Sequence, residues 1–237
     1  MYNKNIKHMN KTNIGIFIMV GLLALALMIP RTADHFRSYD RTVSVKGLCE
    51  KEVKANKVIW PLVIKLGGNE LAPLYDRVDE QNKQLRAFLH SAGISDDQIS
   101  VSITSSDKYT SDYSNDRAAR FIVKSVMTVC TTDVDAVLAL QGRQDELFRK
   151  GIMLQSDWDC RTVFDFTALN DIKPEMIEQA TKSARQAAEK FAQDSDSRLG
   201  KIKNATQGTF TISDRDENTP YIKNVRVVSS VTYYLSK

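Results

Sequence analysis

The three cysteines are the residues with the clearest potential chemistry. Cys49, Cys130 and Cys160 form an odd set, so at most one disulfide can join two of them within the chain. Cys130 and Cys160 lie on predicted strands that flank one helical segment, and they can therefore be neighbours in the fold. We hypothesise a Cys130–Cys160 disulfide with Cys49 free and buried. The alternative, about equally compatible with the sequence, is three unpaired cysteines in the core.

Acidic residues offer a second kind of chemistry. Asp157, Asp159 and Asp165 could supply the paired carboxylates of a hydrolase. In an extended strand, however, the alternation of side chains places all three opposite Trp158 and Phe164. A solvated sheet face is therefore the favoured interpretation of these carboxylates.

A third candidate is a calcium loop. Asp214, Asp216 and Asn218 resemble its opening, but the loop needs a central glycine and a final glutamate. This chain has Thr219 and Val225 at those positions. We therefore interpret the segment as a solvated hairpin turn.

The chain has few histidines that could act as catalytic groups or metal ligands. The histidines are His8, His35 and His90, and His90 is expected on the surface of a helix. The sequence contains no metalloprotease, serine-hydrolase, redox-cysteine, dinucleotide or phosphate-loop motif. We therefore expect no catalytic residues, no metal and no cofactor, and the chain is predicted not to be an enzyme.

Four aromatic residues are candidate interaction elements. Tyr109 and Tyr113 lie in the polar segment 107–117, which predicts a loop or hairpin tip. A pocket near these tyrosines, Trp60 and Trp158 would suit a small ligand or a partner protein. The alternative is that both tryptophans are core residues.

The charge pattern argues against one class of partner. The net charge is +4, and part of it comes from Lys4, Lys7 and Lys11, so the rest of the chain is nearly neutral. A protein that binds nucleic acid is expected to carry a concentrated basic face. No nucleic-acid partner is therefore predicted.

The same lysines precede an uncharged run, residues 14–30, whose length is at the short end for a membrane-spanning helix. This pattern predicts a signal anchor over residues 1–31 and a polar stem over 32–40, with the rest of the chain exported. Ala24 and Ala26 also fit a cleavage pattern, but the apolar residues after them make a cleaved signal peptide less favoured. A buried helix of the globular fold is the remaining alternative.

Beyond the stem, strands alternate with helices. Apolar alternation and helical spacing predict strands over 42–46, 58–66, 99–103, 121–129, 158–166, 202–212 and 225–235, and helices over 71–89, 134–147 and 173–191. Gly93 and Gly151 are expected to end the first two helices, and Thr132 or Asp133 to cap the second. Pro61 within the second strand suggests an edge or a bulge. The pattern indicates an α+β fold of antiparallel sheets with long helices packed on one face. The domain is expected over 41–237, and a division into two subdomains would fall near 132–152.

The C-terminal stretch has the clearest pattern. Pro174 suits the first turn of its helix, and Gly200 is a plausible stop after it. The apolar face of the helix is narrow and mostly alanine, which implies close approach to a sheet that includes the strand over 225–235. This face consists of Ile177, Ala180, Ala184, Ala187, Ala188 and Phe191.

Separated blocks of the chain carry a family resemblance. They are Arg41–Leu48 with Glu50, Glu52 and Val53, then Val58–Pro61, Leu169–Ile177, Ala184–Ala192 and Val225–Leu235. Together they resemble the bacterial envelope branch of the SIMPL-domain family, over essentially all of 41–237. The resemblance implies an α+β fold in the periplasm or cell envelope, large ring-like oligomers in some members, and links to oxidative-stress tolerance. It supplies no catalytic residues, and the cysteines are not part of its pattern.

Three functions follow, in order of preference. The first is a non-enzymatic envelope protein that self-associates through strand edges, with the terminal strand and the 107–117 hairpin as contact elements. It would be a single-pass protein of the bacterial inner membrane with its C-terminal domain in the periplasm, or a periplasmic protein if the leader is cleaved. The second is a binding module for a small envelope ligand or partner protein. The third is a carboxylate-dependent hydrolase.

Overall fold

The computed structural model describes residues 18–23, 41–108 and 119–236. They form an α+β fold with two antiparallel sheets and several helices. The chain divides into two compact units, and neither is continuous in sequence. The first holds Met1–Cys49, Glu175–Phe210 and Val227–Lys237, and the second holds Glu50–Pro174 and Thr211–Arg226. Residues 132–152, where the sequence suggested a division, lie inside the second unit.

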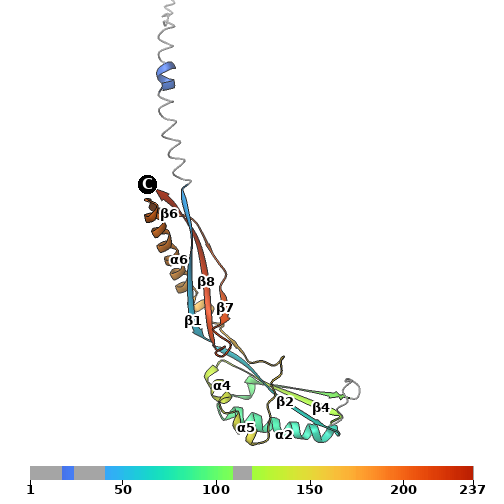
Figure 1. The fold of residues 1–237 in the computed structure, drawn as a ribbon. Helices are drawn as coiled ribbons and strands as arrows, with labels where there is room; N and C mark the ends of the chain where they lie inside the picture. Colours follow the sequence, from blue (N-terminus) through green and yellow to red (C-terminus); the bar gives the residue numbers. More distant parts are fainter. Residues whose placement is uncertain (1–17, 24–40, 109–118, 237) are drawn as a thin grey trace, which may run out of the picture. The chain divides into compact units, whose positions relative to one another are not determined.

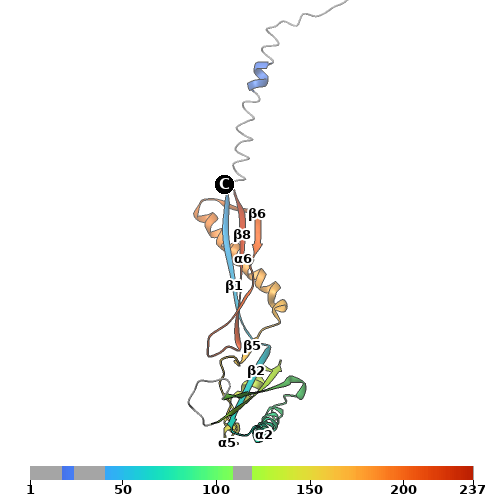
Figure 2. The same ribbon diagram turned by 90° about the vertical axis from the view of Figure 1, so that its right-hand side faces the viewer.

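The first unit is a sheet covered by one helix. The strands follow the order β1-β8-β6, with β1 at Thr42–Lys54, β8 at Ile222–Ser236 and β6 at Arg198–Gln207. The helix α6, Leu169–Asp194, lies along these strands (Figures 1 and 2). Its buried alanines pack against Val45 of β1 and against Val231 and Tyr233 of β8.

The packing of α6 on β1 is unusually close. The buried residues of the helix recur every four positions and form one narrow ridge: Met176, Ala180, Ala184, Ala188 and Ala192. A Cβ atom added to Gly47 of β1 would lie 1.9 Å from the carbonyl oxygen of Ala180 and 2.4 Å from the backbone nitrogen of Ala184. The close approach predicted from the alanines is therefore confirmed, and it requires glycine on the facing strand.

Several boundaries in this unit differ from the sequence prediction. The helix begins at Leu169, so Pro174 lies inside it. Phe191, predicted on the apolar face, is 59% exposed. The chain leaves the helix through Asp196, at φ 49°, whereas Gly200 lies within β6. Gly200 is needed there because a Cβ would come 2.9 Å from the carbonyl oxygen of Tyr234.

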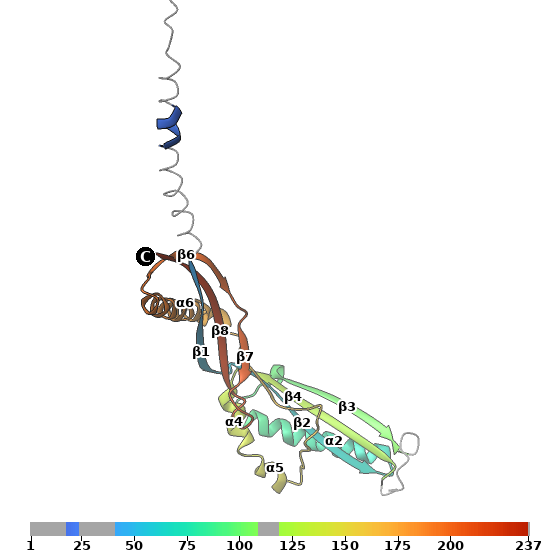
Figure 3. The same ribbon diagram turned by 45° about the horizontal axis from the view of Figure 1, so that its top comes forward.

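The second unit contains a sheet in the order β3-β4-β2-β5. The strands are β3 (Ile99–Asp107), β4 (Phe121–Thr131), β2 (Lys57–Gly68) and β5 (Val163–Asp165). The helices are α2 (Leu71–His90), α4 (Val134–Gln141), α5 (Asp145–Arg149) and a short 3-10 turn, η1 (Asp96–Gln98). A short strand, β7 (Thr211–Asp214), pairs with β8. Figure 3 shows α2 alongside β2, β4 and β3.

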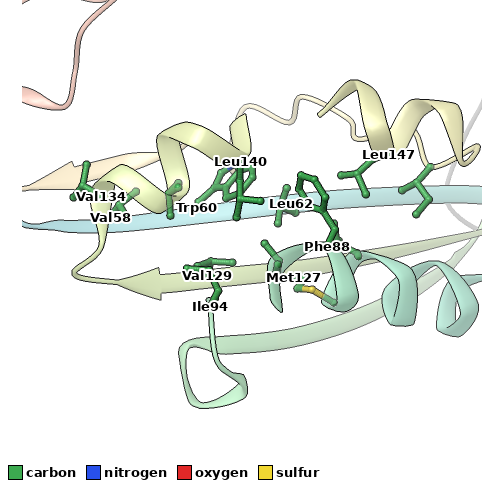
Figure 4. Close-up of a cluster of buried hydrophobic side chains, with 14 of the residues drawn as sticks. Val58, Trp60, Leu62, Phe88, Ile94, Met127, Val129, Val134, Leu140 and Leu147 are labelled. Atoms are coloured by element: carbon green, nitrogen blue, oxygen red, sulfur yellow. The ribbon is translucent and has the colours of Figure 1, made fainter. Parts of the chain in front are cut away.

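The core of the second unit lies between one face of this sheet and its helices. Alternate residues of β2, from Val58 to Ile64, and of β4, at Met127 and Val129, point into it. Residues from α2, α4 and α5 meet them there, among them Phe88, Leu140 and Leu147 (Figure 4). This arrangement gives helices on one face of an antiparallel sheet, as predicted.

Local signals located most elements of this unit correctly. Gly93 and Gly151 follow α2 and α5 with φ of 84° and 77°, so the predicted glycine stops are confirmed. The Asp133 carboxylate caps α4 by accepting a hydrogen bond from the Ala136 amide at 2.9 Å. Three predictions were wrong. The helix predicted over 134–147 is divided into α4 and α5. The strand over 158–166 is only Val163–Asp165, and the strand over 202–212 is split between β6 and β7.

The predicted membrane-spanning run lies mostly outside the described residues. Residues 18–23 are helical, and 14–17 and 24–30 are not described. No helix among the described residues is long and apolar enough to cross a membrane.

Substituting Gly47→Ala tests the close packing. The new methyl group meets helix backbone, which cannot rotate away, so we expect the free energy of unfolding to fall by at least ~2 kcal/mol. Chemical denaturation followed by circular dichroism measures this change. The matched control is Gly142→Ala, where the nearest atom would be 3.4 Å away and where we expect at most ~0.5 kcal/mol of destabilisation. Equal stability of the two variants would contradict the close contact.

Candidate functional site: an open strand edge and a polar cavity

The outermost strand of the second unit, β3, presents an open edge (Figure 3). Among the described residues, β3 is paired only with β4, in continuous register from Ile99 opposite Val129 to Asp107 opposite Phe121. All its residues are exposed except the half-buried ends. One side of a nine-residue strand therefore carries backbone donors and acceptors that face away from the sheet.

Two apolar side chains accompany this edge. Val101 and Ile103 are 38% and 41% exposed. Their partners on β4 are Met127 and Ser125, which are fully buried beneath α2. Because directly opposed residues lie on the same face of a sheet, Val101 and Ile103 are on the helix-covered face but beyond the helix.

The features that usually prevent edge pairing are absent from the interior of β3. Natural edge strands carry lysine, proline or bulges, or are very short. The residues Ile99–Ser106 are Ile, Val, Ser and Thr only, and their register with β4 has no break. The edge strand β6 is different, because it contains Gly200, Lys201 and Lys203 and two register shifts between Leu199 and Asn204. β3 is therefore the better candidate for pairing with another strand.

The structure does not place the contact elements expected from the sequence at an open strand edge. The terminal strand β8 lies between β1 on one side and β6 and β7 on the other, so it is not an open edge, and this expectation was wrong. Tyr109 and Tyr113 lie outside the described residues.

The second candidate site is a cavity of about 360 Å³ beside β2. On this side, β5 pairs with β2 only as far as Ile59. The next contact is a hydrogen bond of 2.8 Å from the Gln155 amide to the carbonyl of Val63. Between these two points residues 156–162 leave the strand, and the cavity lies in the gap that they create.

Pro61 occupies the interrupted stretch of β2. The N–H and C=O of one strand residue point to the same side, as do those of the residue two positions on. Since Val63 points toward Gln155, Pro61 points into the same gap, where its missing N–H costs no ladder hydrogen bond. The prediction that Pro61 marks an edge therefore holds locally, although β2 is an inner strand.

The loop over the cavity is held by polar contacts. Lys124 of β4 forms an ion pair with Asp157, and the Cys160 amide donates to the Asp157 carbonyl at 3.0 Å. Gln141 Nε2 donates to Thr162 Oγ1 at 3.4 Å. The hydrogen bond with Lys124 lowers the pKa of Asp157 and raises the pKa of Lys124. Both groups are therefore charged at neutral pH.

The two tryptophans have different environments. Trp60 is 3% exposed and lines the cavity from the core side, so the core alternative is confirmed for it. Trp158 is 78% exposed in the loop, with the guanidinium of Arg161 stacked 3.5 Å from its ring centroid. For Trp158 the core alternative was wrong.

The remaining titratable candidates do not converge. Asp159 and Asp165 are exposed, and His90 lies on the surface within 3.2 Å of Asp96. Asp216 accepts hydrogen bonds within its own turn from Thr219 and from Arg215, which lower its pKa to about 2. Among the described residues, no group of three or more His, Cys, Asp or Glu side chains is placed to hold a metal ion.

Comparison with known proteins places the chain in a family. Residues 43–232 match the family model SIMPL, described as a protein of unknown function (DUF541). The chain belongs to the SIMPL family. No curated protein matches it. The predicted membership of the SIMPL family is therefore confirmed, whereas the assignment to its bacterial envelope branch stays a prediction. A family model of unknown function assigns no catalytic residues to this chain.

No disulfide joins any of the three cysteines of the SIMPL chain, all of which lie in the described residues. Cys130 is exposed on β4 opposite Ile59 of β2, whereas Cys160 lies in the loop on the other side of β2. The strand between them explains why the hypothesised disulfide is absent from the structure. Cys49 is buried, and its thiol donates to Gln179 Oε1 at 3.2 Å.

Sequence reasoning missed most of the residues that define these sites. The amides of Gln141, Gln144 and Gln155 and the guanidinium of Arg161 line the cavity, and no motif connects them. The open edge of β3 did have a signal, because an alternating segment without charge or proline is readable from the sequence.

The cysteine environments predict an order of thiol reactivity. In unfolded, unreduced protein a thiol reagent should titrate all 3 cysteines. In the folded protein we expect Cys130 to react first, Cys160 more slowly and Cys49 last, since burial limits access. Mass spectrometry of the labelled peptides measures the order. A titration of only one free thiol in the unfolded chain would contradict this structure and support the Cys130–Cys160 disulfide.

Proposed function

We propose that this SIMPL protein is a non-enzymatic, self-associating component of the bacterial cell envelope. The observation that carries the proposal is the open edge of β3, which is long, uncharged within its interior and free of register breaks. An edge of this kind is a ready template for pairing with another strand.

A second copy of the chain is a natural partner for this edge. Antiparallel pairing of β3 with β3 of the second copy is two-fold symmetric, so the same residues meet on both sides. The outward backbone groups of both strands gain hydrogen bonds, and Val101 and Ile103 of each copy lose exposed apolar surface. Burial of this surface adds a hydrophobic contribution to the backbone pairing.

The envelope location rests on the N-terminal sequence. Positive charges before the apolar run 14–30 favour retention of the start of the chain in the cytoplasm and export of the rest. The proposal is therefore a single-pass inner-membrane protein with its α+β fold in the periplasm, or a periplasmic protein if the leader is removed. A part in oxidative-stress tolerance is suggested by the family resemblance alone.

The non-enzymatic part of the proposal is supported by the state of the reactive groups. Asp157 is neutralised by Lys124, and Asp216 is committed to its own turn. Cys49 is buried against Gln179. These side chains hold local structure, and of the three only Asp157 lines the cavity beside β2.

The edge is tested by Ile103→Lys in the full-length protein, solubilised in detergent and weighed by native mass spectrometry. The lysine places like charges in a symmetric interface, so we expect association to weaken by more than ~10-fold. The matched control is Ile202→Lys on the bulged edge β6, where the replaced side chain is 50% exposed. The same loss in both variants, or a monomeric wild type, would contradict the proposal.

The anchor is tested by replacing Leu22 and Leu23 with arginine. Each arginine at the centre of a spanning helix costs about 2.5–3.5 kcal/mol of insertion free energy. We expect the wild-type protein to stay in the membrane fraction after alkaline extraction and the variant to be lost from it. Protease treatment of spheroplasts should digest the wild-type domain beyond residue 41. Quantitative release of intact wild-type protein by alkali would rule out the anchor.

A further inference from the structure

The cavity beside Trp60 has the dimensions of a ligand site. Its volume of about 360 Å³ lies within the range of small-molecule pockets, about 300–1,000 Å³. Trp60, Leu62 and Leu154 form an apolar wall on the side of the core. The loop 156–162 forms the opposite wall and is fixed by the Lys124–Asp157 ion pair.

The polar groups of the lining are mostly uncharged. The side-chain amides of Gln141, Gln144 and Gln155 each carry donors and an acceptor, and the hydroxyls of Ser156 and Thr162 can do both. A ligand rich in hydroxyl groups, which also donate and accept, matches this set. Simple anions accept only and ammonium groups donate only, so neither matches as well.

The charges near the cavity are already partnered. Asp157 is paired with Lys124, and the guanidinium of Arg161 is stacked on Trp158. No single sign of charge dominates the lining, which favours a neutral ligand over an ionic one.

Trp158 provides a stacking surface next to the cavity. It belongs to the same loop, its ring is backed by Arg161 at 3.5 Å, and 78% of the residue is exposed. A sugar ring has an apolar face of C–H groups and a rim of hydroxyls, so it can stack on an indole while its hydroxyls meet amides.

The strand beside the cavity disfavours a peptide. An extended peptide gains affinity from both N–H and C=O groups of an open edge. Along the gap in β2, the outward residue is Pro61, which has a carbonyl but no N–H. Recognition here must therefore rely on side chains.

We propose that this cavity binds a neutral saccharide, with Trp158 as the stacking platform and the glutamine amides as hydrogen-bonding partners. The site is formed by β2, α4 and the loop 156–162, and it is separate from the β3 edge that carries the proposed self-association.

The chain contains its own reporter of binding. It has 2 tryptophans, Trp60 in the cavity wall and Trp158 beside it, so tryptophan fluorescence, excited selectively over tyrosine, reports on this region alone. Full-length protein in a detergent without a sugar head group is titrated with maltose, cellobiose and N,N′-diacetylchitobiose. Glucuronate and a neutral tetrapeptide serve as comparison probes. We expect a saturable change with at least one neutral disaccharide and none with the comparison probes.

Two variants connect the binding to these residues. In Trp158→Ala, binding is followed by the fluorescence of Trp60. We expect the Kd to rise by up to about tenfold, the range of one lost aromatic contact. Gln144→Ala should also weaken binding, through the loss of an amide partner. The control is Phe148→Ala, a 52% exposed aromatic residue outside the lining, which should bind as the wild type does. Absence of saturation with every disaccharide, stronger binding of glucuronate or the peptide, or wild-type affinity in both variants would overturn the proposal.

Discussion

Backbone hydrogen bonding at strand edges is the constraint that shapes both candidate sites. A strand that ends a sheet leaves half of its N–H and C=O groups facing outward, and each needs water or another partner. The chain meets this need differently at each edge. β6 has lysines and bulges, β5 is very short, and the gap in β2 contains a proline. β3 has none of these features in its interior, so its outward groups remain suited to pairing.

The same constraint explains the cavity. Residues 155–165 follow the edge of β2 but make strand contacts only at Gln155 and from Val163 onward. At Pro61 the edge offers no donor, so the chain gains little by staying in register there. The intervening loop instead takes its hydrogen bonds from Lys124 and Gln141, and a cavity lined with amides results.

The first unit depends on a steric constraint instead. The alanine ridge of α6 reaches β1 so closely that Gly47 cannot carry a side chain. A helix with an alanine face gains less hydrophobic free energy from each side chain. Its backbone can, however, approach a sheet closely and pack densely against it.

Sequence reasoning was most successful where local chemistry decides the structure. The alanine face of α6, the glycine stops at Gly93 and Gly151 and the cap at Asp133 follow from rules that act within a few residues. Sequence reasoning failed where the structure of a segment depends on a distant segment of the chain with which it must pair. The alternation over 158–166 resembled a strand, but β2 offers no continuous edge to pair with it, and Trp158 is therefore exposed. Gly200 was predicted to end the helix, but it is a glycine because β8 lies too close for a side chain. The sequence alone does not distinguish these two reasons for a glycine. The cavity residues come from separate segments, so no local pattern could assemble them.

Hydrogen–deuterium exchange of the β3 amides, measured in full-length protein at low and high concentration, shows whether β3 pairs with a second copy. If β3 pairs with a second copy, protection of residues 99–107 rises with concentration while the amides of β6 stay unchanged. If β3 exchanges at the same rate at both concentrations while the protein remains oligomeric, the open edge of β3 is not the interface between copies.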